Sequence, residues 1–269
     1  MEAVRFVAVG ELLVDVVAEG SGHDARIHVC PAGSAFNAAV SAAAAGADAT
    51  VIGTVGDDPG GRMILAELAA RGVHAEVTIS AGPTGTFLLT DGEIRVDAGV
   101  SHTVVLPDRI EADAVLVSGY LPAETIEAAL ARAQASWVAL DAARLPELPP
   151  GGNALVANED AARRLTGKGP EVAATELGER YRLACVTRAA LGAVAVLDGR
   201  LETAAADPVD GDPPGAGDAF AAGLLVGLAR GAELGRALAE GCRWGALAAA
   251  SRAGWSMFEA PETRRKESP

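Results

Sequence analysis

The stretch from residue 112 to residue 140 constrains the fold more than any other part of the chain. Ala112 to Val117 is a short apolar run, Ala123 to Gln134 has the periodicity of an amphipathic helix, and Trp137 to Leu140 is a second apolar run. Two strands joined by a helix pair in parallel, because the helix must cross the face of the sheet to return the chain to the same end. The stretch therefore predicts an α/β fold with a mainly parallel sheet.

Other parts of the chain repeat this pattern. Val4 to Val9, Ala49 to Val55 and Leu183 to Thr187 are apolar runs of the kind found in buried strands. Half of the residues are apolar but only 4% are aromatic, which favours closely packed helices on a sheet. No internal repeat or linker divides the sequence, so we expect one domain over residues 1–269.

The bulk charge and the cysteines exclude several classes of function. The 22 basic and 36 acidic residues give a net charge of −14, which repels the phosphate backbone of nucleic acids. Cys30, Cys185 and Cys242 are scattered, which suggests neither a disulfide framework nor a zinc site. No basic leader and no apolar run long enough to span a membrane is found in the sequence, so a cytoplasmic protein without membrane partners is the simplest expectation.

A loop near the C-terminal end carries the clearest sign of chemistry. Gly215, Ala216 and Gly217 precede Asp218 and a long apolar run, which indicates a small-residue loop that opens a helix. The first N–H groups of a helix have no partner within the helix and bind oxyanions. Asp218 could be an ordinary helix cap, or a base that takes a proton while those N–H groups hold developing charge. The loop alone leaves both interpretations open.

With Asp212 ahead of it, this loop resembles the C-terminal signature of the PfkB (ribokinase-like) carbohydrate kinases, although Pro213 stands where a threonine is usual. The resemblance implies a ribokinase-like three-layer α/β/α core with a small β-sheet lid. It also implies ATP-dependent phosphorylation of a hydroxyl group on a sugar or sugar-like compound. Asp218 would then be the catalytic base, and the N–H groups of Gly215, Ala216 and Gly217 would stabilise the transferring phosphoryl group.

The resemblance extends to the acceptor side. Asp15 follows Gly10 as in the first strand of the family, and Gly33 and Asn37 match the N-terminal signature, in which Ala32 replaces a glycine. These three residues, Asp15, Gly33 and Asn37, are therefore expected to bind the acceptor. From the residues alone, composition favours the solvent face of an edge strand for Asp15, and Asn37 could be a capping or surface residue.

A β-hairpin signature follows the first third of the chain. Residues 86–90 and 93–96 are strand-like and flank Asp91-Gly92, and the family places a lid over the sugar at this point. We expect the lid to comprise about residues 78–100 and parts of 11–30. Thr86 and Arg95 are candidate substrate-binding residues, and alternation along a hairpin leaves open which faces the acceptor. A homodimer through the lid is a further hypothesis.

The remaining matches concern the nucleotide. ATP and Mg²⁺ are the cofactors that the resemblance implies, and a monovalent cation such as K⁺ is left open by Asp210 and Asp212. Arg144 resembles the arginine of the family's Asp-x-x-Arg, with a solvated surface arginine as the alternative. Glu159 is the candidate for the Mg²⁺ water shell, because Ala161 replaces the usual acid and acids in a first helical turn are ordinary caps. The expected nucleotide-binding residues are Asn158, Thr187, Gly192, Asp212, Gly215, Gly217 and Arg144.

Two other functions stay open at this stage. One is the same fold acting on a nucleoside, a vitamin or a phosphosugar; a phosphosugar would call for a basic cluster, for which only Arg95 and Arg26 are available. The other is a non-catalytic sugar or nucleotide sensor, because Ala32, Ala161, Ala189 and Pro213 depart from the family pattern. The intact Asp218 argues against a sensor, since a binding protein gains nothing from a base.

Overall fold

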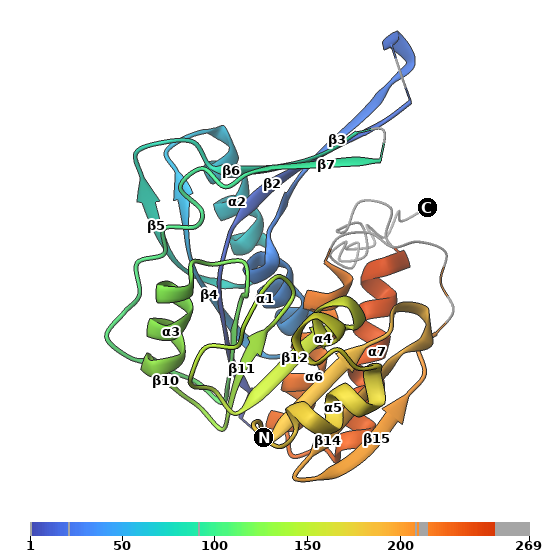
Figure 1. Cartoon of the computed structure of the whole chain (residues 1–269). Coiled ribbons are helices and arrows are strands. Elements are labelled where there is room, and N and C mark those ends of the chain that lie inside the picture. The colour runs from blue at the N-terminus through green and yellow to red at the C-terminus, as the bar shows by residue number, and fades with distance from the viewer. Residues whose placement is uncertain (1, 21, 91, 208, 210–214, 251–269) are drawn as a thin grey trace, which may run out of the picture.

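A nine-stranded sheet forms the centre of the computed structural model, which describes residues 2–20, 22–90, 92–207, 209 and 215–250. The strand order is β15-β14-β13-β12-β11-β9-β1-β4-β5, and the sheet runs through the lower part of Figure 1. The pairs on either side of β14 are antiparallel and the other pairs are parallel. The strands are β1 (Arg5–Val9), β4 (Asp48–Gly56), β5 (His74–Ser80), β9 (Ala114–Val117), β11 (Trp137–Asp141), β12 (Ala154–Asn158), β13 (Leu183–Thr187), β14 (Ala193–Leu197) and β15 (Arg200–Ala204).

Helices cover both faces of this sheet. Along β1, Phe6 and Ala8 belong to one buried cluster while Val7 and Val9 belong to the other, because successive side chains of a strand point to opposite faces. The first cluster includes residues of α1 (Ser34–Ala44), α2 (Pro59–Ala70), α6 (Ala216–Ala229) and α7 (Leu234–Ala250). The second includes residues of α3 (Ala123–Arg132), α4 (Glu159–Thr166) and α5 (Pro170–Leu177). The result is an α/β/α arrangement with an alanine-rich core.

A second, smaller sheet projects from the main body beyond α2 (Figure 1). Its order is β3-β2-β6-β7, built from β2 (Leu13–Glu19), β3 (Arg26–Ala32), β6 (Gly85–Thr90) and β7 (Glu93–Asp97). The β2–β6 pair is parallel and the other two pairs are antiparallel. The minor elements are the 3-10 turns η1 (Gly22–Asp24) and η2 (Ala189–Leu191) and the short parallel pair β8 (Ile110–Glu111) and β10 (Ala133–Gln134).

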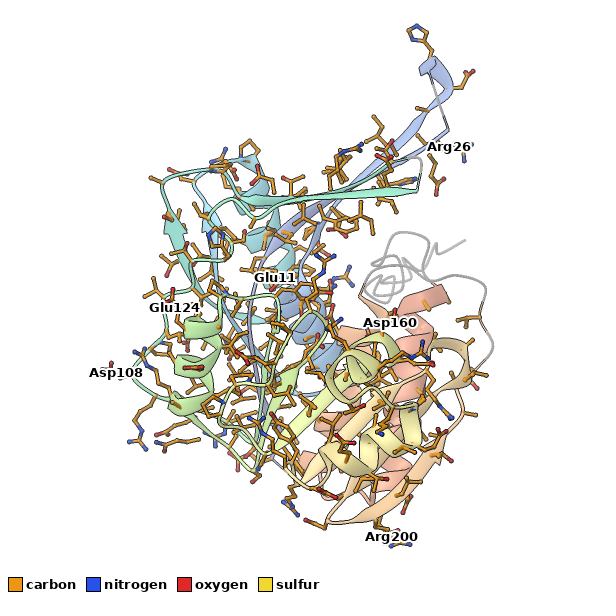
Figure 2. All side chains as sticks on the ribbon, in the orientation of Figure 1. Glu11, Arg26, Asp108, Glu124, Asp160 and Arg200 are labelled. Carbon is orange, nitrogen blue, oxygen red and sulfur yellow. The ribbon has the colours of Figure 1, made fainter. Side chains whose placement is uncertain are left out.

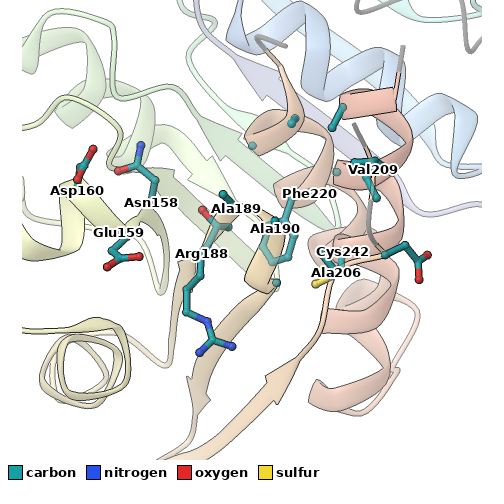
Figure 3. A pocket seen from close by; sticks show the side chains of 18 residues that line it. Asn158, Glu159, Asp160, Arg188, Ala189, Ala190, Ala206, Val209, Phe220 and Cys242 are labelled. Atoms are coloured by element: carbon teal, nitrogen blue, oxygen red, sulfur yellow. The ribbon is translucent and has the colours of Figure 1, made fainter. Parts of the chain in front are cut away.

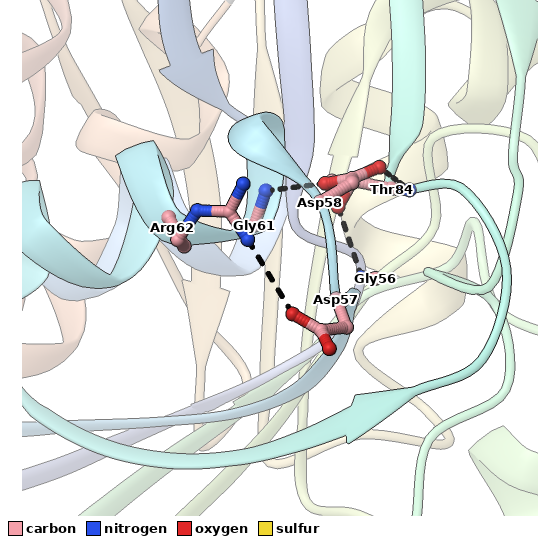
Figure 4. A network of polar contacts seen from close by, with 6 residues as sticks. All are labelled: Gly56, Asp57, Asp58, Gly61, Arg62 and Thr84. Carbon is pink, nitrogen blue, oxygen red and sulfur yellow. Dashed lines mark hydrogen bonds and ion pairs between the residues drawn. The ribbon is translucent and has the colours of Figure 1, made fainter.

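A network of polar contacts fixes the base of the second sheet to the core (Figure 4). Asp58 caps α2 by accepting a hydrogen bond from the N–H of Gly61 at 2.8 Å. The same carboxylate accepts from the backbone N–H and the hydroxyl of Thr84, at 2.7 and 2.6 Å, and the Thr84 hydroxyl in turn accepts from the N–H of Gly56. These bonds lower the pKa of Asp58, although partial burial opposes them. The turn between β4 and α2 therefore holds Thr84, the residue just before β6.

The elements differ from the sequence prediction mainly at their ends. The helix that the small-residue loop is expected to open begins within that loop, at Ala216, which puts Asp218 in its first turn. The helix expected to reach Gln134 ends at Arg132, since residues 133 and 134 pair with β8. Within the described part of the chain, no helix is long and apolar enough to cross a membrane.

Candidate active site

The site lies where the carboxyl ends of the central strands meet the first turns of α1 and α6. Glu11 follows β1, residues 118–120 follow β9, and Asp141 ends β11. Parallel strands bring their carboxyl ends to one edge of the sheet, and open α/β sheets bind ligands at that edge. The fold therefore gathers polar groups here that are far apart in the sequence.

Asp218 is held from both of its oxygens by side chains of α1. Ser34 donates from Oγ to Oδ1 at 2.7 Å, and Asn37 donates from Nδ2 to Oδ2 at 2.9 Å. The cap position of α6 is Gly215, which makes no side-chain cap bond. Asp218 is thus oriented by a neighbouring helix, a geometry that differs from that of a simple cap. The same contacts bring together two of the residues predicted from the sequence, Asp218 and Asn37.

Two glycines allow the helix starts to approach this closely. Gly33, at the cap of α1, has φ +102°, and a Cβ atom there would lie 2.4 Å from the carbonyl oxygen of Glu11. Gly215 has φ +98°, and a Cβ atom there would lie 2.7 Å from Nδ2 of Asn37. A φ near +100° is rare for residues with a side chain, and approaches this short leave no room for a Cβ atom. The predicted residue Gly33 therefore shapes the site through its backbone.

Burial and mutual repulsion raise the pKa values of the carboxyl groups around Asp218. Burial raises the pKa of Asp218 itself to about 6, although the bonds from Asn37 and Ser34 oppose this. Burial, followed by the charge of Asp218, raises the pKa of Asp15 to about 7 and that of Asp141 to about 8. Glu11 behaves similarly, with a pKa raised to about 7 mainly by burial. These couplings put Asp15 close enough to Asp218 for their charges to interact.

Sequence reasoning missed four polar residues of this cluster: Glu11, Ser34, Ser118 and Asp141. Ser34, only 6% exposed, stands within the matched N-terminal signature, and Asp141 begins the Asp-x-x-Arg that drew attention to Arg144. Glu11 and Ser118 each follow the end of an apolar strand, and Oγ of Ser118 donates to Oε2 of Glu11 at 2.8 Å. Their position just after apolar strands could have identified them in the sequence as candidate site residues.

The face of the second sheet that carries Asp15 is the one directed to Asp218. Asp15 lies opposite Cys30 and Phe87, so these side chains share its face. Thr86 lies opposite Val14, and Arg95 lies opposite Leu88, which puts both on the other face. Arg95 is also exposed and forms an ion pair with Glu93. Neither Thr86 nor Arg95 therefore shares the face of the sheet that carries Asp15.

A cavity of about 630 Å³ adjoins the start of α6 (Figure 3). It lies between the start of α4 on one side and α6 and α7 on the other, and Phe220, Cys242 and Val209 form part of its apolar wall. Its volume lies within the range of about 300–1,000 Å³ typical of small-ligand sites. The predicted nucleotide-binding residues that line it are Asn158, Thr187, Gly192 and Gly217, together with Glu159 and Ala216.

Three features of the cavity bear on whether it could hold a nucleotide with Mg²⁺. Gly217 lies at the first turn of α6, and a Cβ atom there would meet nothing within 4 Å, so its backbone borders open space. Glu159 lines the cavity but also forms an ion pair with Arg163 at 3.0 Å. Among the described residues, no group of three or more histidine, cysteine or acidic side chains could hold a metal by itself. The cavity fits a nucleotide whose phosphates reach α6, and Mg²⁺ held largely by phosphates and water.

Two predicted residues that the structure describes, Arg144 and Gly215, are not part of the lining of this cavity. The guanidinium of Arg144 lies over the ring of Tyr120, 5.9 Å from its centroid, and Arg144 is not among the described residues that line the cavity. The charges of Asp141, Asp218 and Glu11 all raise the pKa of Tyr120, so the pair lies on the side of the carboxylate cluster. Asp212 lies outside the described residues, as does Asp210.

Comparison with known proteins identifies similar chains. The sequence model of the pfkB family carbohydrate kinases matches residues 4–259. A fructokinase of Klebsiella pneumoniae is 28% identical over 262 residues, covering 82% of this chain and 83% of that enzyme. A crystal structure of ribokinase from Thermotoga maritima superposes with a TM-score of 0.79 at 19% identity, over 95% of this chain and 96% of that one. The structure of Arabidopsis thaliana ribokinase complexed with ribose and ATP gives 0.76 at 20% identity, over 93% and 94%. The predicted ribokinase-like fold, with its mainly parallel sheet and small second sheet, is confirmed.

Proposed function

The chain belongs to the PfkB family of carbohydrate kinases, and from that premise we propose that Asp218 is the base for phosphoryl transfer to a hydroxyl group of a neutral sugar. The observation that carries this proposal is the double hydrogen bond from Ser34 and Asn37, which orients the carboxylate of Asp218 at the start of α6. A carboxylate held in one orientation can accept the proton of an attacking hydroxyl group, provided that the hydroxyl lies within hydrogen-bonding reach.

The pKa of Asp218 suits this role. Burial raises it to about 6, near enough to neutral pH for efficient proton transfer while leaving the group mostly ionised above that value. The two donors from α1 prevent a larger rise, because they stabilise the charged form. We infer that Ser34 and Asn37 adjust the basicity of Asp218 as well as its orientation.

The start of α6 supplies the charge stabilisation. The N–H groups of Gly215, Ala216 and Gly217 belong to a first helical turn, whose donors have no intrahelical partner and lie at the positive end of the helix dipole. Phosphoryl transfer depends mainly on positioning and on the stabilisation of charge on the phosphoryl oxygens. These N–H groups adjoin both the base and the cavity, so one short segment serves both partners of the reaction.

Members of this family use ATP and Mg²⁺. When bound, the nucleotide supplies the transferable γ-phosphoryl group, and Mg²⁺ neutralises part of its charge. We propose that Asn158, Thr187, Gly192 and Gly217 hold the nucleotide in the cavity. We assign Glu159 to the outer shell of Mg²⁺, where a single carboxylate is sufficient because this ion keeps several of its waters.

The acceptor side favours a neutral, hydroxyl-rich compound. Asp15, Asn37 and the backbone at Gly33 are proposed to bind it, and carboxylates suit hydroxyl groups because each can accept more than one donor. A phosphosugar finds little support: Arg95 faces away and is paired, and Arg26 lies at the far end of the projecting sheet (Figure 2). The ionised carboxylate of Asp218 would repel an anionic acceptor.

A homodimer through the second sheet is a further proposal. Ile27 and Val29 on β3 and Ile94 and Val96 on β7 are each more than half exposed, so both outer strands of this sheet present apolar side chains. Unpaired edge strands and exposed apolar surface favour association. Analytical ultracentrifugation should then give a dimer that Val96→Lys converts to a monomer; a monomeric wild-type protein would contradict the proposal.

The test of the proposed reaction is ADP release from MgATP over a panel of neutral sugars, sugar acids, phosphosugars and nucleosides. We expect turnover with a neutral sugar and none with the anionic acceptors. Turnover with a nucleoside alone would favour the alternative acceptor class. Binding of ATP without turnover on any acceptor would favour the sensor, the alternative in which the site binds without reacting.

A further inference from the structure

Glu11 is a buried carboxyl group that the proposed reaction does not use. It lies two residues beyond the end of β1, it is 9% exposed, and it lies in the interior where the two sheets meet (Figure 2). Acidic side chains are rarely buried unless they are hydrogen-bonded or paired, because they lose their hydration. A glutamate retained in this position therefore calls for a structural explanation.

The first partner of Glu11 is a side chain from the next strand of the sheet. Oγ of Ser118 donates to Oε2 of Glu11 at 2.8 Å, and Ser118 is only 2% exposed. Ser118 follows β9, and its backbone N–H donates to the carbonyl of Val9 in β1. The bond therefore fixes the Glu11 side chain to the rigid end of the central sheet.

The second partner of Glu11 is the start of α1. The backbone N–H of Ser34, the first residue of that helix, helps to lower the pKa of the Glu11 carboxyl group against the larger effect of burial, and a Cβ atom on the neighbouring Gly33 would lie 2.4 Å from the carbonyl oxygen of Glu11. First-turn N–H groups lack partners within their helix, and a carboxylate there is further stabilised by the helix dipole. The cap residue Gly33 has no side chain that could accept a hydrogen bond from these N–H groups.

Ser34 links Glu11 to the proposed base. Its N–H contributes to the electrostatic environment of the Glu11 carboxyl group, while its Oγ donates to Oδ1 of Asp218 at 2.7 Å. The chain of contacts thus runs from Ser118 through Glu11 and Ser34 to Asp218, and joins β9, β1, α1 and α6. Asn37, a few residues along the same helix, donates to the other oxygen of Asp218. The position of α1 decides the geometry of both donors.

We propose that Glu11 is a positioning residue for phosphoryl transfer, and this proposal rests on the proposed role of Asp218. Glu11 holds the first turn of α1 so that Ser34 and Asn37 orient the base. It does not touch the reacting atoms, and it acts through Ser34. Losing this anchor would allow the start of α1 to shift, and a displacement of about 1 Å can cost about 10²-fold in rate. The nucleotide cavity contains no α1 residue, so binding of ATP should be little affected.

Glu11→Leu and Glu11→Gln separate positioning from stability. Leucine fills a similar volume but accepts no hydrogen bond, whereas the glutamine side-chain oxygen still accepts from the N–H of Ser34. We expect kcat to fall about tenfold or more in Glu11→Leu and to recover most of that loss in Glu11→Gln, with KM for ATP within about twofold of wild type. Glu124→Leu, an exposed site on α3, is the matched control and should be indistinguishable from wild type (Figure 2).

A double-mutant cycle tests the route through Ser34. In the wild type, Glu11→Leu should lower kcat strongly. If Glu11 acts through Ser34, the same substitution should lower kcat much less in a Ser34→Ala background, because the hydrogen bond from Ser34 to Asp218 is already absent. Fully additive effects, or equal kcat values for the two Glu11 variants, would overturn the proposal. Should Glu11→Leu melt below the assay temperature, Ser118→Ala replaces it in the cycle, with the same non-additivity expected.

The Asp218→Asn variant, assayed beside these variants, distinguishes a failure of Asp218 as the base from a failure of Glu11 as a positioning residue. An Asp218→Asn enzyme with nearly the wild-type rate would refute the role of Asp218 itself, whatever Glu11 does. An inactive Asp218→Asn enzyme together with a Glu11→Leu enzyme of normal kcat would leave the base assignment intact and refute the role of Glu11 alone.

Discussion

Gly33→Ala is the substitution for which the structure gives the sharpest expectation. Gly33 caps α1 with φ +102° and ψ 148°, a combination that residues with a side chain rarely adopt. An alanine Cβ atom would lie 2.4 Å from the carbonyl oxygen of Glu11 and 2.9 Å from the amide nitrogen of Leu13. Both contacts are with backbone, so no side chain can rotate to relieve them.

The cost of this substitution has two parts. Backbone strain at a forbidden φ/ψ position costs about 1–3 kcal/mol, and forcing packed atoms apart costs about 1–3 kcal/mol more. The free energy of unfolding should therefore fall by about 2–6 kcal/mol, a large share of the roughly 5–15 kcal/mol that stabilises a typical domain. Because the strain falls between Glu11 and the first residue of α1, kcat should fall as well.

The assay is urea unfolding of Gly33→Ala beside Gly72→Ala. Gly72 also has a positive φ, +70°, but a Cβ atom there would meet nothing within 4 Å. It should lose only the conformational term, about 1–2 kcal/mol. If the two variants lose equal stability, or if Gly33→Ala unfolds like wild type, the close approach of α1 to Glu11 is wrong.

Three further predictions concern the same region. Ser34→Ala removes a donor that lowers the pKa of Asp218, so the acid limb of the pH profile of kcat/KM should move to higher pH. Gly217→Asp adds a carboxylate at the open start of α6 and should raise KM for ATP about tenfold or more, far beyond the effect of Gly217→Ala. Folded Glu11 keeps its proton up to about pH 7 whereas the unfolded chain releases it near 4.5, so the free energy of unfolding should fall as pH rises through that window. Urea titrations should show that Glu11→Gln removes about 3 kcal/mol of this pH dependence.

The order of the elements could be predicted because it depends on local patterns. The two apolar runs around the helical segment at 123–134 become β9 and β11, parallel neighbours in the sheet as expected. The boundary at Gln134 could not be predicted, since residues 133 and 134 leave the helix to pair with β8, a contact made by another part of the chain. Sequence propensity predicts that a segment is helical, whereas the residue at which the helix ends depends on contacts with other parts of the chain.

The candidate site divides in the same way. Asp218 and Asn37 were found through motifs, and their direct contact became visible only in the fold because residues far apart in the chain form it. The face occupied by Arg95 could not be predicted, because β-strand faces alternate and only its register against Leu88 decides its direction. Glu11 has no motif of its own in the sequence, because its role arises from partners in β9 and α1.

The rate of the Asp218→Asn enzyme tests the central claim most directly. Asparagine has nearly the same shape and can still accept from Ser34 or Asn37, but its amide cannot take a proton from a hydroxyl group. With the best acceptor and saturating MgATP, we expect kcat to fall by about 10²–10⁴, with ATP binding and the unfolding midpoint close to wild type. A variant that folds, binds ATP and retains nearly the wild-type rate would contradict the assignment of Asp218 as the base.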